Sequence, residues 1–308
     1  MSTVQETGAV LDDARLEQLE DFFLNASVGL ALGDARDEVS SANRALCLLL
    51  GCVSPDACAR PIADLFADAG AGAQLVDRVR AGEVVSHTEV ELARADGGVQ
   101  GAIVDASGRF EDGAYTGSRW FVRPKLTAAI PTVDDELQSF DDADPDSDAG
   151  RWAASLVDEL DARAALDALS VSERRVRLAE LEEFFDNAPA AIHFIEASGN
   201  VTSANKADLT NVGHLDSPGE YVGHHVRQAY ADQALLEDLL GRLGGGTPVI
   251  NCRAELRRKD GSTHSVIVYS SSRVTAGEFE NTRCMVFSNP DQTAEPTQLR
   301  RFDWPRDS

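Results

Sequence analysis

Apolar and polar positions along the chain follow an order of segments that occurs twice. In each occurrence, leucines and phenylalanines at helical spacing (16–23 and 178–185) lead into a short apolar strand. A second strand ending in Ser-Ala-Asn, a helical stretch ending at glycine, an amphipathic helix and three strands joined by hairpins follow. Asp-Gly pairs typical of type I′ turns stand within these hairpins, at 96–97 and 260–261. This order predicts an antiparallel sheet with helices packed on one face.

The two occurrences are copies of one sequence. When the chain is shifted by 162 residues, Arg15–Gly51 aligns with Arg177–Gly213, and 15 of the 37 positions are identical. With a shift of 164, Val90–Arg123 aligns with Ala254–Phe287, with 12 identities in 34 positions. This period is far above the ~20–50 residues of solenoid repeats. The chain therefore contains two copies of one domain.

The composition indicates a folded cytoplasmic protein and argues against several partners. Hydrophobic residues make up 43% of the 308 residues, and 52 acids against 28 bases give a formal charge of −24. This acidity disfavours binding to nucleic acid or to an anionic membrane surface. There is no secretory signal or spanning segment at the N-terminus, and the five cysteines form no paired framework. We therefore expect a cytoplasmic location, without nucleic acid or membrane as partner.

Several stretches of the second copy carry a family likeness: FFDNAPAAIHFIEASGNVTSANKADL from Phe184, EYVGHH from Glu220 and AELRRKDGSTHSVIVYSSS from Ala254. With these stretches, the second copy resembles the PAS domains that serve as input modules of bacterial sensor histidine kinases. The first copy is less similar, through Phe22-Phe23, Ser41-Ala42-Asn43 and GRFEDGAYTGSRWFV. It is identified mainly through the repeat.

The resemblance implies an α+β fold with two PAS-type domains. Each would be a five-stranded antiparallel sheet with helices on one face, and an acidic linker and an amphipathic helix would join them. The expected divisions are an N-terminal tail (1–14), a degenerate PAS-like domain (15–124), an acidic disordered linker (125–150), an amphipathic connecting helix (151–176), a second PAS domain (177–290) and a C-terminal tail (291–308).

The segment between the copies has two parts. Eight acids in the nineteen residues 132–150 predict a disordered linker. From residue 151 onward, apolar residues at three-four spacing predict an amphipathic helix that needs a partner surface. PAS domains commonly dimerise through such flanking helices, so the resemblance implies a homodimer. The alternative is a helix folded back on its own domain.

Motifs of catalysis are missing from the sequence. It has no GxxxxGK[ST], GxSxG, HExxH or paired CxxC motif, so we do not expect an enzyme. A PAS domain can also hold haem through a histidine, or a small organic ligand, and these remain alternatives to a domain without cofactor. The adjacent His224 and His225 point in different directions on any regular element, which disfavours their sharing one metal. We expect no metal site.

A ligand pocket between sheet and helices would be apolar with a few polar contacts. The candidates for its lining in the second copy are His193, Asn205, Tyr230, Cys252 and Tyr269. Asn205 has a second interpretation, because an asparagine between strand and helix can cap the helix. In the first copy, Trp120 stands where the second has Cys284. The larger side chain would fill a cavity, so the first domain is predicted to be structural.

These observations favour a cytoplasmic regulatory protein of tandem PAS domains without an effector domain. It would act by protein–protein interaction, as a homodimer or as an adaptor for a sensor kinase or another regulator. The alternatives are a PAS sensor that binds a small molecule or haem, and a structural scaffold.

Overall fold

The computed structural model describes residues 3–126, 152, 155–156, 160–275 and 278–289. They form two compact units, 1–190 and 191–308, each containing one sheet. Within the described residues, no helix is both long enough and apolar enough to cross a membrane.

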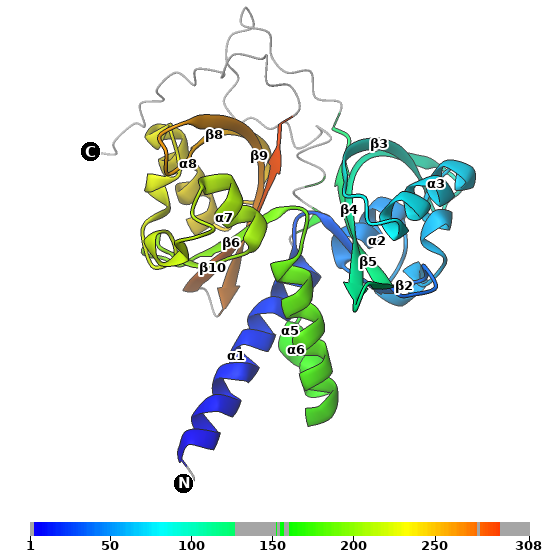
Figure 1. The fold of residues 1–308 in the computed structure, drawn as a ribbon, viewed down its shortest axis with the longest axis horizontal. Helices are drawn as coiled ribbons and strands as arrows, with labels where there is room; N and C mark the ends of the chain where they lie inside the picture. The colour runs from blue at the N-terminus through cyan, green and yellow to red at the C-terminus, as the bar shows by residue number, and fades with distance from the viewer. Residues whose placement is uncertain (1–2, 127–151, 153–154, 157–159, 276–277, 290–308) are drawn as a thin grey trace, which may run out of the picture. The chain divides into compact units, whose positions relative to one another are not determined.

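The first unit contains a five-stranded antiparallel sheet in the order β2-β1-β5-β4-β3. Helices α2 and α3 lie against one face of this sheet (Figure 1). Helix α1 begins at Thr3, inside the segment predicted as an N-terminal tail. The elements in chain order are α1 (Thr3–Asn25), β1 (Gly29–Gly33), β2 (Val39–Ala42), α2 (Arg44–Leu50), η1 (Pro55–Cys58), η2 (Ile62–Leu65), α3 (Ala69–Arg80), β3 (Val85–Ala93), β4 (Val99–Glu111), β5 (Ala114–Pro124), α5 (Ala162–Asp167) and α6 (Val171–Asp186).

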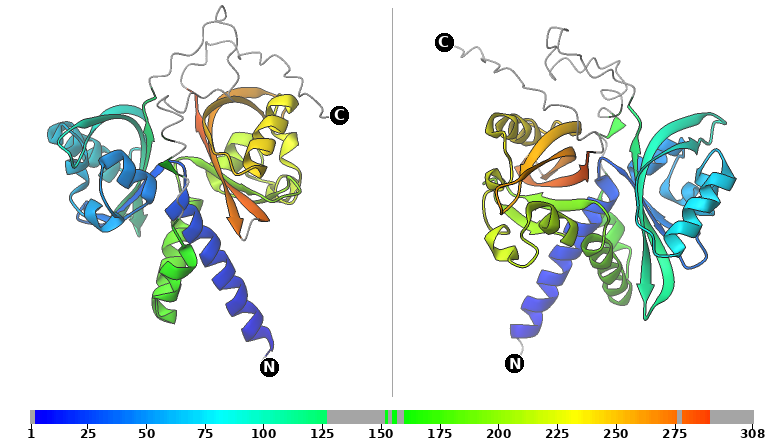
Figure 2. Two further views of the ribbon diagram at one scale, coloured as in Figure 1. Left: turned by 180° about the vertical axis from the view of Figure 1, so that it is seen from behind. Right: turned by 45° about the horizontal axis from the view of Figure 1, so that its top comes forward.

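The second unit repeats this topology, with strand order β7-β6-β10-β9-β8 and with α7 and α8 on one face of the sheet (Figures 1 and 2). Its elements are β6 (Ala191–Ile195), β7 (Val201–Ala204), α7 (Lys206–Val212), η4 (Pro218–Glu220), η5 (Val226–Gln228), α8 (Gln233–Gly244), β8 (Val249–Arg257), β9 (Thr263–Thr275) and β10 (Glu278–Ser288). The predicted α+β class, with two five-stranded antiparallel sheets and helices on one face of each, is confirmed.

The short helix after the second strand is bounded by the same residues in both copies. Asn43 precedes α2 and Asn205 precedes α7, and each side chain accepts a hydrogen bond from a backbone N–H of the first helical turn. Each helix ends at a glycine in the left-handed conformation, Gly51 with φ 66° and Gly213 with φ 75°. A glycine adopts this conformation without the steric cost that a Cβ brings. The repeated sequence therefore sets both ends of this helix.

One hairpin prediction is wrong. A type I′ turn needs positive φ at both central residues, and among the described non-glycine residues only Asp37, His87, Asp112 and Asn251 have it. Asp96 and Asp260 are therefore not in type I′ turns, and longer loops join those strands. The two-residue turn of this kind is Asp112-Gly113, with φ 50° and 81°, between the paired residues Glu111 and Ala114. The matching Gly277 lies outside the described residues.

The connecting segment forms two helices, broken at Ser170. This residue begins α6 with a capping box, in which its side chain accepts the backbone N–H of Glu173 and the Glu173 carboxylate accepts the backbone N–H of Ser170. The acidic linker lies almost wholly outside the described residues.

Three apolar residues in the C-terminal half of α6, Leu181, Phe184 and Phe185, are buried inside the first unit. Phe184 lies edge-on to Phe23 of α1 and stacks on Phe121 of β5. Helices α1 and α6 thus lie side by side (Figure 2). The partner surface predicted for this helix belongs to the same chain. It is the first domain's sheet and helix, although the repeat assigns α6 to the second copy.

Candidate functional site

The interior of the second domain holds a buried pair of ionisable side chains. His193 lies on β6 with 2% of its surface exposed, and Asp208 lies on α7 with 0% exposed. The Nδ1 atom of His193 is 3.0 Å from the Oδ1 atom of Asp208. A buried charge is costly unless it is paired, so the two groups support each other in the ionised state.

Local sequence places this pair. The Oδ1 atom of Asn205 accepts hydrogen bonds from the backbone N–H of Ile192, at 3.0 Å, and from that of Asp208, at 2.9 Å. One amide side chain therefore ties β6 to the first turn of α7. His193 is the next strand residue after Ile192, and Asp208 is the residue capped, so the same contacts that start the helix bring the imidazole and the carboxylate together.

The surroundings keep His193 protonated. Burial alone opposes its charged form, but the sulfur of Cys284 and the carboxylate of Asp208 together hold the pKa of His193 well above its usual value. Cys284 is the cross-strand neighbour of His193 on β10. Burial also raises the pKa of Tyr221 well above its usual value, and the Asp208 carboxylate adds to this rise. The charged form of His193 and the neutral form of Tyr221 are therefore both favoured in this core.

The hydrogen bonds of the pair are incomplete within the described part of the chain. The Nε2 atom of His193 and the Oδ2 atom of Asp208 are both buried without a partner there, as is the hydroxyl of Ser270 on β9. Buried polar atoms are nearly always hydrogen-bonded in folded proteins, to protein or to ordered water. Each of these atoms could take a hydrogen bond from or to a water or a small polar molecule, next to the Cys284 thiol at His193 and the Tyr221 phenol at Asp208.

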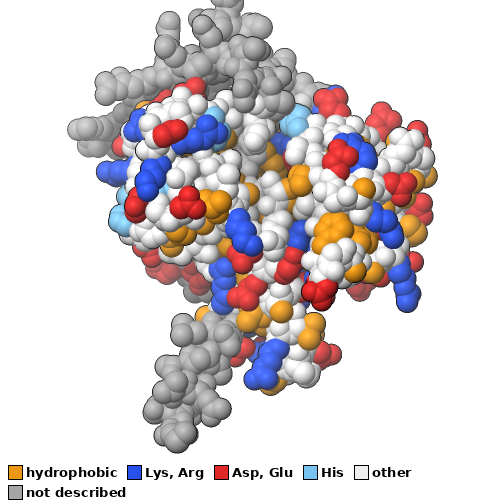
Figure 3. Space-filling view, viewed as in Figure 1, with side chains coloured by type: hydrophobic (Ala, Val, Ile, Leu, Met, Phe, Trp, Pro, Cys, Tyr) orange, Lys and Arg blue, Asp and Glu red, His pale blue; other side chains and the backbone are white. Residues whose placement is uncertain are grey.

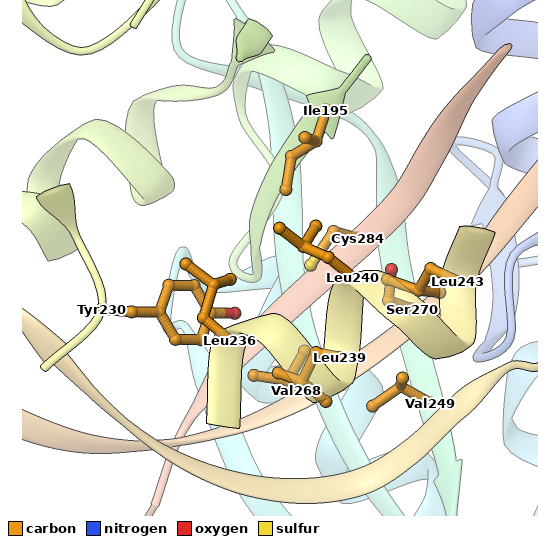
Figure 4. Close-up of a pocket in the computed structure, with 10 residues that line it drawn as sticks. All are labelled: Ile195, Tyr230, Leu236, Leu239, Leu240, Leu243, Val249, Val268, Ser270 and Cys284. Atoms are coloured by element: carbon orange, nitrogen blue, oxygen red, sulfur yellow. The ribbon is translucent and has the colours of Figure 1, made fainter. Parts of the chain in front are cut away.

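A small cavity lies in the same core (Figure 4). Helix α8 contributes four leucines, and the polar groups come from Tyr230, Ser270 and Cys284. Its volume is about 10 Å³, close to the minimum that holds one water molecule. Typical ligand pockets have roughly 300–1,000 Å³. In this conformation the cavity takes a water, and a larger ligand requires the helices to move away from the sheet.

The residues predicted from the sequence fall into three groups. His193, Tyr230 and Cys252 lie in or beside the core that contains the cavity, and burial raises the pKa of Cys252 to about 12. Asn205 is a helix cap. Tyr269 lies between Val268 and Ser270, which both line the cavity, so it points to the opposite face of β9. Its hydroxyl donates to Asn251 at 3.4 Å, and Tyr269 does not line this cavity.

Sequence reasoning missed Asp208, Tyr221, Ser270 and Cys284 as members of the site. The internal repeat held a signal for three of them. Asp208 aligns with Leu46, Cys284 with Trp120 and Ser270 with Ala106, so the second copy has polar or smaller groups where the first is apolar. In the same alignment, Ala31 of the first copy stands at the position of His193. Positions that differ in polarity between two copies of one fold are candidates for function.

The first domain is filled at the corresponding place. Trp120 is 1% exposed, its ring lies 6.0 Å from that of Phe66, and its Nε1 donates to the Ser118 hydroxyl at 2.8 Å. Ala31, on the paired strand, and Leu46 are fully buried. The place that corresponds to the second domain's cavity is therefore filled by side chains, and the structural role of the first domain stays a prediction.

The residues present do not fit a haem. His193 is engaged with Asp208, and the adjacent cavity is far smaller than a macrocycle. His225 caps a short helix, where its Nδ1 accepts the backbone N–H of Arg227 at 3.1 Å. In the described residues no group of three or more His, Cys, Asp or Glu side chains is arranged to hold a metal ion.

No protein-family model and no curated protein matches the sequence. Among solved structures, the PAS domain of an HTR-like protein from Haloarcula marismortui is 23% identical, with coverage of 37% of this chain and 97% of that chain and a TM-score of 0.30. A domain of a sensory box sensor histidine kinase/response regulator from Geobacter sulfurreducens is 15% identical, with coverage of 36% and 92% and a TM-score of 0.30.

A match that extends over most of the chain is the structure of an RNA-binding Light-Oxygen-Voltage receptor. It is 14% identical, with coverage of 85% of this chain and 95% of that chain and a TM-score of 0.31. TM-scores of this size are low, so the assignment rests on the strand order and on the helix placement within each unit. By these features, both domains have the predicted PAS-type fold.

Proposed function

We propose that this chain, which consists of two domains with the PAS fold, is a signalling module in which the second domain senses and α6 transmits. The output would be contact with another protein, such as a sensor kinase or another regulator, in the cytoplasm. The observation that carries this proposal is the buried His193–Asp208 pair, 3.0 Å apart, at a place where the first domain is apolar.

Helix α6 is suited to transmit a change because it packs on the first domain and is joined along the chain to the first strand of the second. It ends at Asp186, and β6, which carries His193, begins five residues later at Ala191. On the other side, Glu183 forms ion pairs with Arg119 and, at 3.1 Å, with Arg109 of the first sheet. A shift of β6 therefore acts on a helix that is anchored to the first domain.

The mechanism would be a shift between two populations of α6. A protonation change, a water or a small ligand that alters the His193–Asp208 pair would favour one position of β6. Each position of β6 would in turn favour one position of α6 on the first sheet. The populations of α6 would shift by an amount set by the difference in free energy between its two positions. A partner that reads α6 or the surface beside it would bind one state better than the other.

We include a homodimer in this proposal, and the packing of α6 restricts which side of that helix can form the dimer. The aromatic residues of α6 are buried within the chain, whereas Val171 and Val176 on the same helix are 70% and 71% exposed. A dimer formed by the flanking helices would therefore use the exposed side of α6. Light scattering distinguishes a particle of 33.0 kDa from one of twice that mass.

The test is amide hydrogen exchange on His193→Gln. Removing the charged imidazole leaves Asp208 buried and unpaired, so we expect exchange in residues 171–186 to rise about fivefold or more, the range of ordinary coupling energies. The matched control is His224→Gln, an exposed histidine of the same domain, which should leave α6 unchanged. If His193→Gln alters exchange in the second domain and leaves α6 untouched, the transmission role is wrong.

A second candidate function is a sensor that holds a small polar ligand in the second domain. The partnerless Nε2 of His193, Oδ2 of Asp208 and hydroxyl of Ser270 favour it. Native mass spectrometry and an absorption spectrum of freshly purified protein separate the two candidates. If the wild-type protein carries extra mass that the His193→Gln variant lacks, ligand sensing is indicated. A colourless protein at the polypeptide mass would favour signalling without a ligand.

A further inference from the structure

Three of the five cysteines of the chain meet at one place in the first domain, away from the site in the second. Cys47 lies on α2, Cys58 is the last residue of η1, and Cys52 lies between the two elements. The Sγ atoms of Cys47 and Cys58 are 3.5 Å apart. This is contact distance for two thiols, and only a small movement separates it from the ~2 Å of a disulfide bond.

The loop between α2 and η1 brings these thiols together. Gly51 ends α2 in the left-handed conformation, and the next residue, Cys52, donates its backbone N–H to the carbonyl of Cys47 at 2.8 Å. The chain then reverses, and Ser54 and Pro55 start η1. This turn points Cys58 back at the helix. The fold therefore holds the thiols in place without help from a ligand.

The three thiols differ in exposure and in acidity. Cys47 and Cys58 are buried, whereas Cys52 is partly exposed, next to Val53, which is almost wholly in solvent. The hydrogen bond between Cys47 and Cys58 lowers the pKa of Cys47 and raises that of Cys58. Burial and the proximity of Cys58 raise the pKa of Cys52. Cys47 is thus the most acidic thiol of the cluster, and Cys52 is the one that solvent reaches.

The fold itself does not need these thiols. In the second domain, Leu209 stands at the position of Cys47 and His214 at that of Cys52. Leu209 is buried in the core there, so an apolar side chain satisfies the same packing. The described residues offer no arrangement of three such groups for a metal ion. Two thiols at contact distance are suited to disulfide chemistry.

We propose that Cys47, Cys52 and Cys58 form a thiol–disulfide site that hydrogen peroxide oxidises to a Cys47–Cys58 disulfide. This site is independent of the signalling role of the second domain. Its substrate class is a small peroxide, which meets the partly exposed Cys52 first because Cys47 and Cys58 are buried.

The reaction proceeds in three balanced steps. The Cys52 thiolate attacks one peroxide oxygen, the O–O bond breaks, and the departing hydroxide takes up a proton to leave as water, so that Cys52 becomes a sulfenic acid. The Cys58 sulfur attacks the Cys52 sulfur, the S–O bond breaks, and the hydroxide leaves as water with the Cys58 proton. The Cys47 thiolate then displaces Cys52 from Cys58, and Cys52 recovers a proton. In sum, two thiols and one peroxide give one disulfide and two waters.

The test is peroxide treatment of the full chain, followed by alkylation under denaturing conditions and trypsin digestion. Because trypsin does not cleave before Pro61, all three cysteines fall in one peptide, 45–78. After oxidation we expect this peptide to carry one alkyl group, on Cys52, in place of three. A reductant added before alkylation should restore all three. Three alkyl groups after peroxide treatment would overturn the proposal.

Variants identify the order of the steps. Cys47→Ala should stop the reaction at a Cys52–Cys58 disulfide, and Cys58→Ala should leave a sulfenic acid on Cys52 that dimedone traps. Cys52→Ser should slow disulfide formation about tenfold, because the remaining thiols are buried; an unchanged rate would overturn the role of Cys52. The matched control is Val53→Ala, a change next to Cys52 at a side chain that is almost wholly exposed, which should react as the wild type does. Circular dichroism verifies that each variant is folded.

Discussion

At the scale of single residues, the two copies share some side chains for folding and differ in others. Asn43 and Asn205 do the same work: each Oδ1 accepts one N–H from the first helical turn and one from the preceding strand. Both are buried, so no water replaces these bonds. The pair His193 and Asp208 has no such counterpart, because Ala31 and Leu46 stand in its place. Shared residues therefore indicate structure, and unshared polar residues indicate function.

The His193–Asp208 pair predicts a pH dependence of stability. A histidine whose pKa is raised in the folded state stabilises the fold fully below its unfolded pKa of ~6.5, and this contribution is lost as pH rises through the folded value. We therefore expect the free energy of unfolding of the second domain to fall as pH rises above ~6.5. Urea unfolding at a series of pH values measures this.

His193→Gln should abolish this fall, and His224→Gln should retain it. Proton NMR of the imidazole gives a direct measurement, in which His193 should remain protonated at neutral pH. A resonance of His193 that titrates at the ordinary histidine value would contradict the prediction.

At the scale of elements, the sequence pattern of α6 predicts a helix with an apolar face, and the tertiary structure shows which surface that face packs against. Its residues align with those of α1, and both segments were predicted as helices. The periodicity shows that one face is apolar, and it does not show which surface covers that face. In the structure, the covering surface is α1 and β5, with Phe184 stacked on Phe121 at 5.3 Å and an interplanar angle of 8°. Charge reinforces this contact through Glu183 and Arg119.

Removing this aromatic contact should release α6. Phe184 is 1% exposed, so Phe184→Ala leaves a cavity between helix and sheet, and we expect a loss of about 3–5 kcal/mol in the stability of the first unit. Amide exchange should rise throughout α6 and in the part of α1 that contacts it. The control is Val176→Ala on the same helix, 71% exposed, which should change neither quantity. Equal effects of the two substitutions would show that α6 is not held by its aromatic face.

At the scale of the whole molecule, charge is the dominant property. The 52 acids exceed the 28 bases, and several arginines, among them Arg119, Arg123 and Arg283, are buried. On the face seen in Figure 3, acidic and basic side chains are interspersed, as expected of a solvated surface. Individual exposed ion pairs contribute only about 0–1 kcal/mol each. Because acidic residues outnumber basic ones by 24, the negative side chains repel one another on balance when they lie closer together than the screening length.

Salt should therefore stabilise this protein. As the screening length shortens from ~30 Å at 0.01 M to ~8 Å at 0.15 M, the repulsion weakens more than the short ion pairs do. We expect the midpoint of thermal unfolding to rise by several degrees over this range, measured by calorimetry. Sodium and potassium chloride should act alike, because the effect is screening. A midpoint that falls with salt would show that ion pairs outweigh the net charge.

Much of the fold was readable from the sequence because local signals and the repeat agreed. The capping asparagines and the terminal glycines act through side chains and backbone whose effects are confined to a few neighbours. The hairpin between β4 and β5 shows the limit of that reading. Asp96-Gly97 and Asp112-Gly113 are the same dipeptide, and only the second forms a two-residue turn, because strand register sets the length of each loop.

The sequence by itself determined two copies of one α+β domain and the ends of their short helices, and it offered His193 as one candidate for a pocket lining. The tertiary structure alone decided that Asp208 meets His193, that Cys47 meets Cys58, that Tyr269 lies on the face of β9 opposite the cavity, and that α6 belongs to the first unit. The physical reason is the separation along the chain of the residues that interact. Turns, caps and periodicity depend on residues a few positions apart, whereas these contacts depend on where separate elements come to lie in space.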